Sequence, residues 1–297
     1  MDYGRQVDEL LEELAQSTGI QFEIAENKNS DEATAKTLSK LVRRFKGDSS
    51  RGYFFQQFLL GELTSEEVLR KRKSLRLERN APWVLFLVHF KQPYEEYVVK
   101  MLSSLFSAAS DYVVEIDPVH IALIRQTRLI LSDEKLSEIA VSIVDLLSTE
   151  AMLSVHVAYD RVCKEFGLLK QAFTNCQMAL KIGTLFHSSS NVIGYHDLGI
   201  GKLVYSLPKD ICREYLEDHL NGFDFATLDR ETQNTISVFF GSGLSIAETA
   251  RSLYIHRNTL VYRLDKFEKQ SGLDIRHFED AVTCQIAMLM TEYLRMD

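Results

Sequence analysis

The stretch Leu244–Leu264, LSIAETARSLYIHRNTLVYRL, decides the fold of the C-terminal part of the chain. Ser245 and Glu248 have the spacing of a capping box, in which each side chain bonds the backbone N–H of the other residue at a helix start. Apolar residues at helical spacing follow them, namely Ile246, Ala250 and Leu253. The pattern predicts a short capped helix whose apolar face is buried, with a small residue where a second helix comes close.

A second helix is predicted after the turn that contains Tyr254 and Ile255. Its buried face consists of Leu260, Leu264 and Phe267. Its other face is rich in hydrogen-bond donors, namely His256, Arg257, Asn258, Thr259, Tyr262, Arg263 and Lys266. Arginine can bond guanine bidentately, asparagine can bond adenine, and threonine, tyrosine and lysine can hold phosphates. The two helices therefore predict a DNA-binding helix-turn-helix, against the alternative of a solvated basic face on an ordinary helical hairpin.

Residues near the N-terminus of such a helix usually reach the bases, so Arg257, Asn258 and Thr259 are the first candidates for base contacts. The run from His256 to Leu264, followed by Ser271-Gly272-Leu273-Asp274, resembles the C-terminal helix-turn-helix of the PucR/CdaR family of bacterial transcription regulators. The turn and second helix are also similar to those of Fis-type DNA-binding domains. One departure is Tyr254, which stands where related turns often have glycine, so a positive φ would be strained there.

Composition is that of a soluble globular protein, with 297 residues, 45% hydrophobic and 26% charged, which favours about two domains. The net charge of −8 argues against nucleic-acid binding only if charge is spread evenly along the chain. Between residues 244 and 270, five basic residues oppose three acidic ones and leave +2. A local positive face on an acidic protein fits sequence-specific DNA binding with weak nonspecific affinity.

The cysteines and the N-terminus predict a cytoplasmic protein. The four cysteines are far apart and form no C-x-x-C pair, as expected of free thiols in a reducing compartment: Cys163, Cys176, Cys212 and Cys284. The N-terminal segment MDYGRQVDELLEEL is acidic where a signal peptide is basic and then apolar. The best apolar run, Ala81–Phe90, has the length of a strand and not of a membrane span.

Residues 1–80 are predicted to be mostly helical. Two amphipathic stripes are Val7, Leu10, Leu11 and Leu14, and Leu38, Leu41, Val42 and Phe45, with a short strand possible at Ile20–Ile24. The aromatic cluster Tyr53, Phe54, Phe55 and Phe58 is interpreted as core or a dimer seam rather than a ligand cage. A helix opening at Thr64 carries the basic run Arg70–Arg79. The run is interpreted as a solvated face, against the alternative of a DNA contact, because the helix packs through Leu69, Leu75 and Leu77.

Residues 81–200 alternate between strand and helix patterns in the order βαββαβα. The predicted strands are Trp83–Phe90, Tyr112–Ile116, Val119–Ile124 and Leu153–Ala158, and the helices are Val98–Phe106, Leu136–Leu147 and Phe166–Leu180. Asp117-Pro118 marks a hairpin. The order predicts a ferredoxin-like split βαβ sheet with helices on one face. From Leu168 to Gly199 the sequence also resembles the degenerate nucleotide-cyclase-like (GGDEF-like) domain of the same family.

An active cyclase is the main enzymatic alternative. Two-metal phosphoryl chemistry needs carboxylates at the end of the first strand and in the central hairpin. Trp83–Phe90 contains none, and the hairpin offers only Glu115 and Asp117, without the glycines of a GGDEF turn. Gly199–Lys202 is too short for a phosphate-binding loop and is interpreted as a linker turn. The scattered histidines, including His89 and His156, are interpreted as structural, so we expect no catalytic residues, cofactor or metal, and no enzyme.

The C-terminal region is divided into a linker helix in residues 201–222, at Lys209–Leu220, and an all-α domain in residues 223–297. A helix behind the helix-turn-helix contains Leu228, Thr232, Ile236, Phe239 and Phe240 and ends at Gly241-Ser242-Gly243. A terminal helix is predicted over Ile275–Tyr293, with a buried stripe of Phe278, Val282, Ile286, Leu289 and Met290. The alternative for its end is a dimer contact through Leu289, Met290, Tyr293 and Leu294.

The sequence thus predicts a multidomain α+β regulator that binds double-stranded operator DNA as a homodimer or tetramer. The family resemblance implies an activator that contacts RNA polymerase, a possible small-molecule effector, and control of a catabolic operon for purines, sugar diacids or amino acids. The alternative from another class is a metabolite-binding or nucleotide-processing protein that uses the helix-turn-helix as an interaction module.

Overall fold

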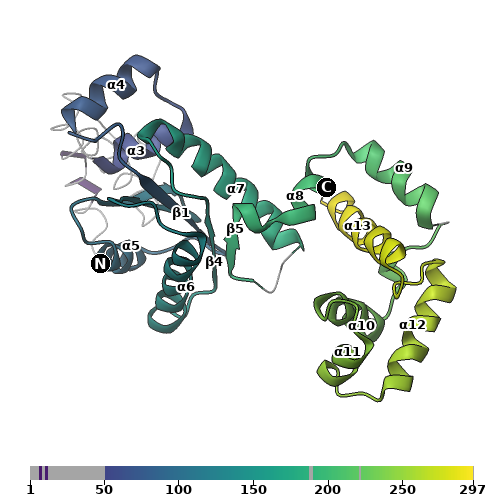
Figure 1. Cartoon of the computed structure of the whole chain (residues 1–297). Coiled ribbons are helices and arrows are strands. Elements are labelled where there is room, and N and C mark those ends of the chain that lie inside the picture. The colour runs from purple at the N-terminus through teal and green to yellow at the C-terminus, as the bar shows by residue number, and fades with distance from the viewer. Residues whose placement is uncertain (1–6, 9–10, 13–50, 187–189, 221, 297) are drawn as a thin grey trace. The chain divides into compact units, whose positions relative to one another are not determined.

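The computed structural model describes residues 7–8, 11–12, 51–186, 190–220 and 222–296. The chain divides into two compact units, a sheet unit of residues 1–180 with 190–196 and a helical unit of residues 181–189 with 197–297 (Figure 1). Of the two amphipathic stripes predicted before residue 51, only Val7 and Leu11 fall within the described residues, and both are helical. The possible strand at Ile20–Ile24 lies outside the described residues.

The sheet has five strands in the order β2-β3-β1-β4-β5. They are β1 (Trp83–Phe90), β2 (Asp111–Asp117), β3 (His120–Gln126), β4 (Val155–Tyr159) and β5 (Val192–Gly194). β1 pairs antiparallel with β3 and β4, and β2 pairs antiparallel with β3. This strand order, with α5 (Glu96–Leu105) between β1 and β2 and α6 (Asp133–Glu150) between β3 and β4, is the predicted split βαβ arrangement. The fifth strand, β5, pairs parallel with β4 and was not predicted, because three residues are too few to show a periodicity.

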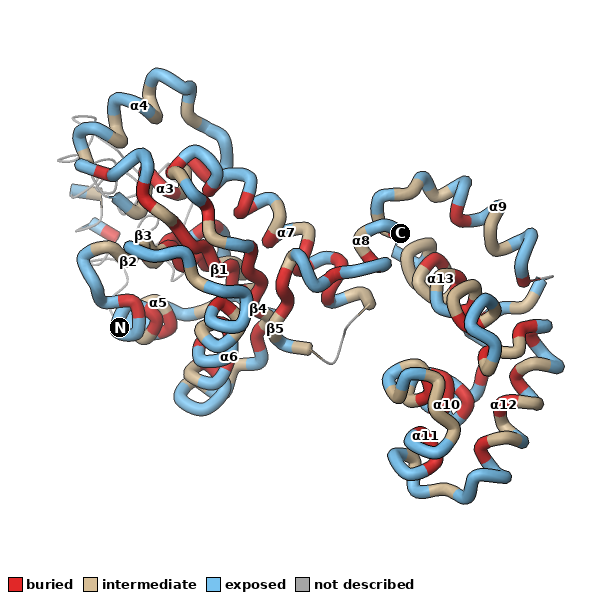
Figure 2. Tube along the Cα trace, viewed as in Figure 1, coloured by how far each residue is buried: buried red, intermediate tan, exposed pale blue. Residues whose placement is uncertain are grey.

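Helices cover both faces of β1, so the prediction of helices on one face was wrong. The even-numbered residues Val84, Phe86, Val88 and Phe90 pack with α5 and α6. On the other face, the ring centroid of Trp83 lies 6.0 Å from that of Phe55 in α3 (Arg51–Leu60). The Sγ atom of Cys176, in α7 (Leu169–Phe186), lies 4.0 Å from the carbonyl oxygen of Leu85. A near-continuous apolar strand has to bury both faces, and Figure 2 shows buried residues along β1.

The aromatic cluster of α3 is part of the core. Phe54, Phe55 and Phe58 are buried, and the rings of all three lie within 4.7–6.0 Å of the Phe166 ring, centroid to centroid. The helix predicted after Thr64 is α4 (Ser65–Ser74), and Thr64 and Glu67 form a reciprocal capping box at its start. α4 ends at Ser74, contains no buried residue and leaves Leu69 exposed, so the packing predicted through Leu69 was wrong, whereas Leu77, just after the helix, is buried as predicted.

The helical unit contains α8 (Gly199–Tyr205), α9 (Lys209–Leu220), α10 (Arg230–Gly241), α11 (Ile246–Ser252), α12 (Arg257–Ser271) and α13 (Phe278–Leu294). α9 confirms the predicted helix at Lys209–Leu220, and Ser242 caps the end of α10 as predicted. Gly199–Lys202 opens α8 and is not a linker turn. Gly201 tolerates no side chain there, because an added Cβ would lie 2.7 Å from the Phe186 ring.

The terminal helix differs from its prediction in both start and buried face. α13 begins at Phe278, which is 75% exposed, and not at Ile275. Its buried residues are small or flexible, namely Ala281, Cys284, Ala287 and Met290. Val282, Ile286 and Leu289 are only partly buried. The helix is apolar over much of its circumference, so hydrophobicity alone does not identify the face that packs, and small side chains permit the closer approach.

The cysteines are all free and buried, as expected. Burial raises the pKa of the Cys163 and Cys284 thiols to about 12, so neither is a nucleophile at neutral pH. Among the residues that the structure describes, no helix has both the length and the hydropathy needed to span a bilayer.

His89 and His156, which were interpreted as scattered structural histidines, lie side by side with His120 on neighbouring strands. His89 of β1 faces His120 of β3 and His156 of β4 in the sheet register. The His89 Nδ1 and His120 Nε2 atoms are 3.1 Å apart, and the Asp117 carboxylate lies 2.8 Å from His120 Nδ1. Desolvation, then the neighbouring His120 and His156, lowers the pKa of His89, and desolvation also lowers that of His156. In the described ranges, no three His, Cys, Asp or Glu side chains are placed to hold a metal ion.

The row of histidines formed by His89, His120 and His156 predicts that the sheet unit loses stability in mild acid. A histidine whose pKa is lowered by folding binds its proton more readily in the unfolded chain, so its stabilising contribution is present above pH about 6.5 and is lost as the pH falls through the folded-state pKa. We expect the urea midpoint of the sheet unit to fall between pH 7.5 and 5.5. The fluorescence of Trp83, the single tryptophan and fully buried in this unit, reports the transition.

The matched comparison is the double variant His89→Gln, His156→Gln. We expect its urea midpoint to fall less than that of the wild type between pH 7.5 and 5.5. Equal pH dependence in both proteins would show that the titration of other groups, and not this row, controls the acid response.

Candidate nucleic-acid interface

The helix-turn-helix is formed by α11 and α12. Ser245 caps α11, because its side chain accepts the backbone N–H of Glu248 at 3.3 Å. The reciprocal half of the predicted capping box is not formed. The Glu248 carboxylate instead binds Arg251, at 2.8 and 2.9 Å, because a guanidinium one turn further along the helix competes for it.

The turn between the helices has the predicted strained residue. Tyr254 has φ of 54° and is 96% exposed. Two backbone bonds close the turn, from Tyr254 N–H to the Arg251 carbonyl at 3.1 Å and from Ile255 N–H to the Ala250 carbonyl at 3.0 Å. A left-handed conformation costs a non-glycine residue on the order of 1 kcal/mol, so the surrounding packing has to maintain it.

The buried face of α12 is the predicted one. Leu260, Leu264 and Phe267 are each at most 2% exposed and share one core with Ile236 and Phe239 of α10. Ala250 of α11 is buried in the same core, while Ile246 and Leu253 pack at its edge. At its end, α12 stops at Gly272, which has φ of 77°. This packing fixes which side of α12 remains in solvent.

The first turn of α12 is open to solvent. His256 is the N-cap, and its Nδ1 atom accepts the Asn258 N–H at 3.2 Å. Arg257, Asn258 and Thr259 are exposed, and their side chains have no partner among the residues that the structure describes. Tyr262, one turn further on, is also exposed. The helix N-terminus adds a partial positive charge to this surface, which favours an anionic partner.

Two predicted members of the site are engaged with α10. Arg263 Nη1 donates to the Thr235 hydroxyl at 3.1 Å, and its Nη2 pairs with the Glu231 carboxylate. Its side chain is only 19% exposed. Lys266 remains exposed, with its Nζ atom 3.5 Å from a carboxylate oxygen of Asp229. Helical periodicity could not separate Arg263 from the open face, because this residue lies at the boundary between the buried and exposed sides of α12.

The geometry of α11, the turn and α12 is that of a helix-turn-helix domain. Residues 233–290 match the family model of the PucR C-terminal helix-turn-helix domain. The resemblance to PucR/CdaR-family regulators is confirmed by this match and by two curated relatives.

These relatives are regulators by name. Over 170 residues, 54% of this chain, the sequence is 27% identical to the purine catabolism regulatory protein of Bacillus subtilis. Over 126 residues, 42% of this chain, it is 25% identical to the carbohydrate diacid regulator of Escherichia coli. The aligned parts span 32% and 33% of those two proteins. A solved structure, the regulator of polyketide synthase expression from Bifidobacterium adolescentis, aligns with 95% of this chain and 97% of its own, with 15% identity and a TM-score of 0.39.

The family matches are to transcription regulators and not to enzymes, in agreement with the expectation that the chain is not an enzyme.

The contacts of Arg263 predict a structural role. We expect Arg263→Ala to lower the local stability of α10 and α12 by about 1–2 kcal/mol, since it removes a charged hydrogen bond and a partly solvated ion pair. Hydrogen–deuterium exchange of peptides covering residues 230–271 measures this as faster exchange. Lys266→Ala is the matched control, because the Lys266–Asp229 pair is exposed on both sides and should contribute little to stability. Equal exchange in the two variants would contradict the assignment.

Proposed function

We propose that the chain is a sequence-specific DNA-binding transcription regulator in which the N-terminal half of α12 enters the major groove of operator DNA. The observation that carries the proposal is the first turn of α12. Its Arg257, Asn258 and Thr259 side chains have no protein partner in the described residues, while the opposite face is held in the core. A rigid helix with free donors at its N-terminus is suited to reading base edges.

Roles follow from side-chain chemistry and position. Arg257 is suited to a guanine and Asn258 to an adenine, because each can form two bonds with that base. Thr259, Tyr262 and Lys266 are suited to phosphates that fix the register of the helix. His256 keeps only its Nε2 atom free, since Nδ1 caps the helix. Arg263 was predicted to contact DNA. We propose instead that it stabilises α12, because Thr235 and Glu231 of α10 already bind its guanidinium.

The sheet unit is proposed to be a non-catalytic, GGDEF-like domain. No carboxylate lies in β1, and two of the three acidic residues of the β2–β3 hairpin are already used, since Asp111 pairs with Arg125. Asp117 binds His120 and accepts the backbone N–H of Val119 at 2.8 Å, so it serves the hairpin. We therefore propose that the sheet unit serves assembly or effector sensing and does not carry out phosphoryl chemistry.

The oligomeric state is proposed from the geometry of helix-turn-helix binding, and the regulated operon from the names of the relatives. One helix-turn-helix reads few base pairs, so a homodimer or tetramer on repeated half-sites is expected. We propose control of a small-metabolite catabolic operon, for purines, sugar diacids or amino acids, in the bacterial cytoplasm, and the names of the two curated relatives support the first two of these substrate classes. As an activator the protein would also contact RNA polymerase, and a small-molecule effector would set its activity.

The proposal predicts salt-dependent binding to the DNA upstream of the adjacent operon, measured by fluorescence anisotropy. Each phosphate contact adds to the slope of log affinity against log salt, so we expect a steep fall. Arg257→Ala and Asn258→Ala should each weaken binding about 5–150-fold, the equivalent of about 1–3 kcal/mol for a lost base contact. Both residues are exposed, so the variants should fold normally.

The matched control is Arg70→Ala, an exposed arginine in the basic run of α4, which should leave the affinity unchanged. If a folded Arg257→Ala, Asn258→Ala double variant binds like the wild type, the reading face is assigned wrongly. Binding that is insensitive to salt would favour the alternative of an interaction module.

A further inference from the structure

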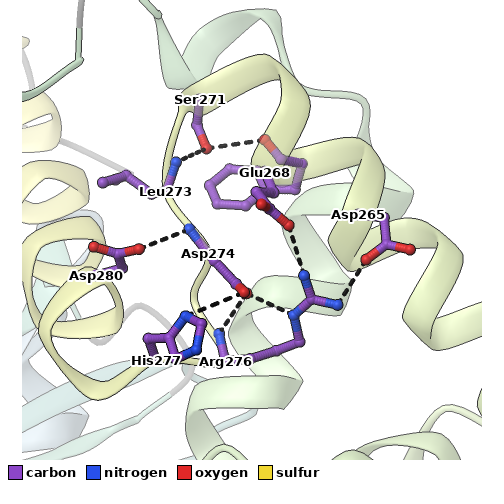
Figure 3. A network of polar contacts seen from close by, with 9 residues as sticks. Asp265, Glu268, Ser271, Leu273, Asp274, Arg276, His277 and Asp280 are labelled. Carbon is purple, nitrogen blue, oxygen red and sulfur yellow. Dashed lines mark hydrogen bonds and ion pairs between the residues drawn. The ribbon is translucent and has the colours of Figure 1, made fainter.

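The loop between α12 and α13 carries an arginine that binds three carboxylates. Arg276 Nη1 lies 2.6 Å from an Asp265 oxygen, Nη2 lies 2.6 Å from a Glu268 oxygen, and Nε lies 2.6 Å from an Asp274 oxygen (Figure 3). Asp265 and Glu268 belong to α12, whereas Asp274 belongs to the loop. Every nitrogen of the guanidinium therefore donates to a carboxylate.

The loop itself is fixed at both ends. Ser271 accepts the Leu273 N–H at 3.2 Å and donates to the Phe267 carbonyl at 2.9 Å, which ties the loop to the end of α12. The Asp274 N–H donates to the Asp280 carboxylate in the first turn of α13 at 3.0 Å. Arg276 thus joins the C-terminal half of α12 to a loop that is anchored on α13.

The network also balances charge on the helix. Asp265 and Glu268 are the acidic residues of α12, the helix that the proposed function brings against DNA phosphates. Asp265 lies eight residues after Arg257, about two turns further along the helix and about 80° round its axis. Arg276 supplies the opposite charge, and its side-chain hydrogen bond lowers the pKa of Asp274.

We propose that Arg276 is a positioning residue for DNA binding: it holds α12 at its angle to α13 and neutralises Asp265 and Glu268, without a DNA contact of its own. This inference rests on the proposed function. A lysine could not replace it, because one ammonium group cannot reproduce a planar fork shared by three carboxylates. The side chain is 27% exposed, so the ion pairs are partly screened and the effect is carried by geometry as well as by charge.

The test is a mutant cycle in DNA affinity, with promoter DNA and the full chain. We expect Arg276→Gln to weaken binding about tenfold, which is the scale of one well-placed charged contact. Arg276→Lys should weaken binding less, because the lysine keeps the charge but not the planar geometry. In the Arg276→Gln background, Asp265→Asn with Glu268→Gln should restore part of the binding, because it removes the unpaired negative charge but does not rebuild the link between α12 and the loop. In the wild-type background the same pair of changes should not improve binding, because Arg276 already neutralises both carboxylates.

The proposal would be overturned if the effects of the Arg276 change and of the carboxylate changes on DNA affinity were additive. An arginine that contacts DNA directly would contribute to the affinity independently of Asp265 and Glu268. Wild-type affinity of Arg276→Gln would overturn it as well. If Arg276→Gln does not fold, judged by circular dichroism, the cycle is run from Arg276→Lys with the same criteria. Failure of the wild type to bind DNA defeats the proposed function, whereas wild-type binding that Arg257→Ala impairs and Arg276→Gln does not defeats only this inference.

Discussion

Burial of Leu260, Leu264 and Phe267 is the interaction on which the functional surface depends. Each buried side chain contributes about 1.5–3 kcal/mol, so together they exceed the strain of about 1–3 kcal/mol at Tyr254 in the turn. The same packing determines which residues of α12 remain in solvent. The proposed reading face is therefore a consequence of the core, which sets its geometry in the free protein.

Polar contacts divide the charged residues of α12 into two groups. Arg263 binds α10, and Asp265 and Glu268 bind Arg276, so these charges orient the helix. Arg257, with Asn258 and Thr259, is left without a protein partner in the described part of the chain. An acidic protein thereby presents free donors at the N-terminus of α12, where the partial positive charge of the helix favours phosphates.

Sequence patterns predicted the elements whose periodicity is long and unambiguous. The bounds of β1, Trp83–Phe90, were predicted correctly because both faces are buried and the apolar run is continuous. The three residues of β5 gave no periodic signal. The prediction of the packing face of α13 was wrong by about one position, since Ala281 and Ala287 are buried where larger apolar residues were expected. Arg263 and Arg276 show the same limit at the site, because ion pairs between separate segments leave no mark on a local pattern.

The most direct test of the account is selection of binding sites from random duplex DNA by the wild type and by Arg257→Ala. We expect a defined wild-type consensus with repeated half-sites. In the variant we expect a loss of preference at one guanine per half-site, with the other positions kept. An unchanged consensus, or the absence of any consensus in the wild type, would contradict the claim that the first turn of α12 reads DNA sequence.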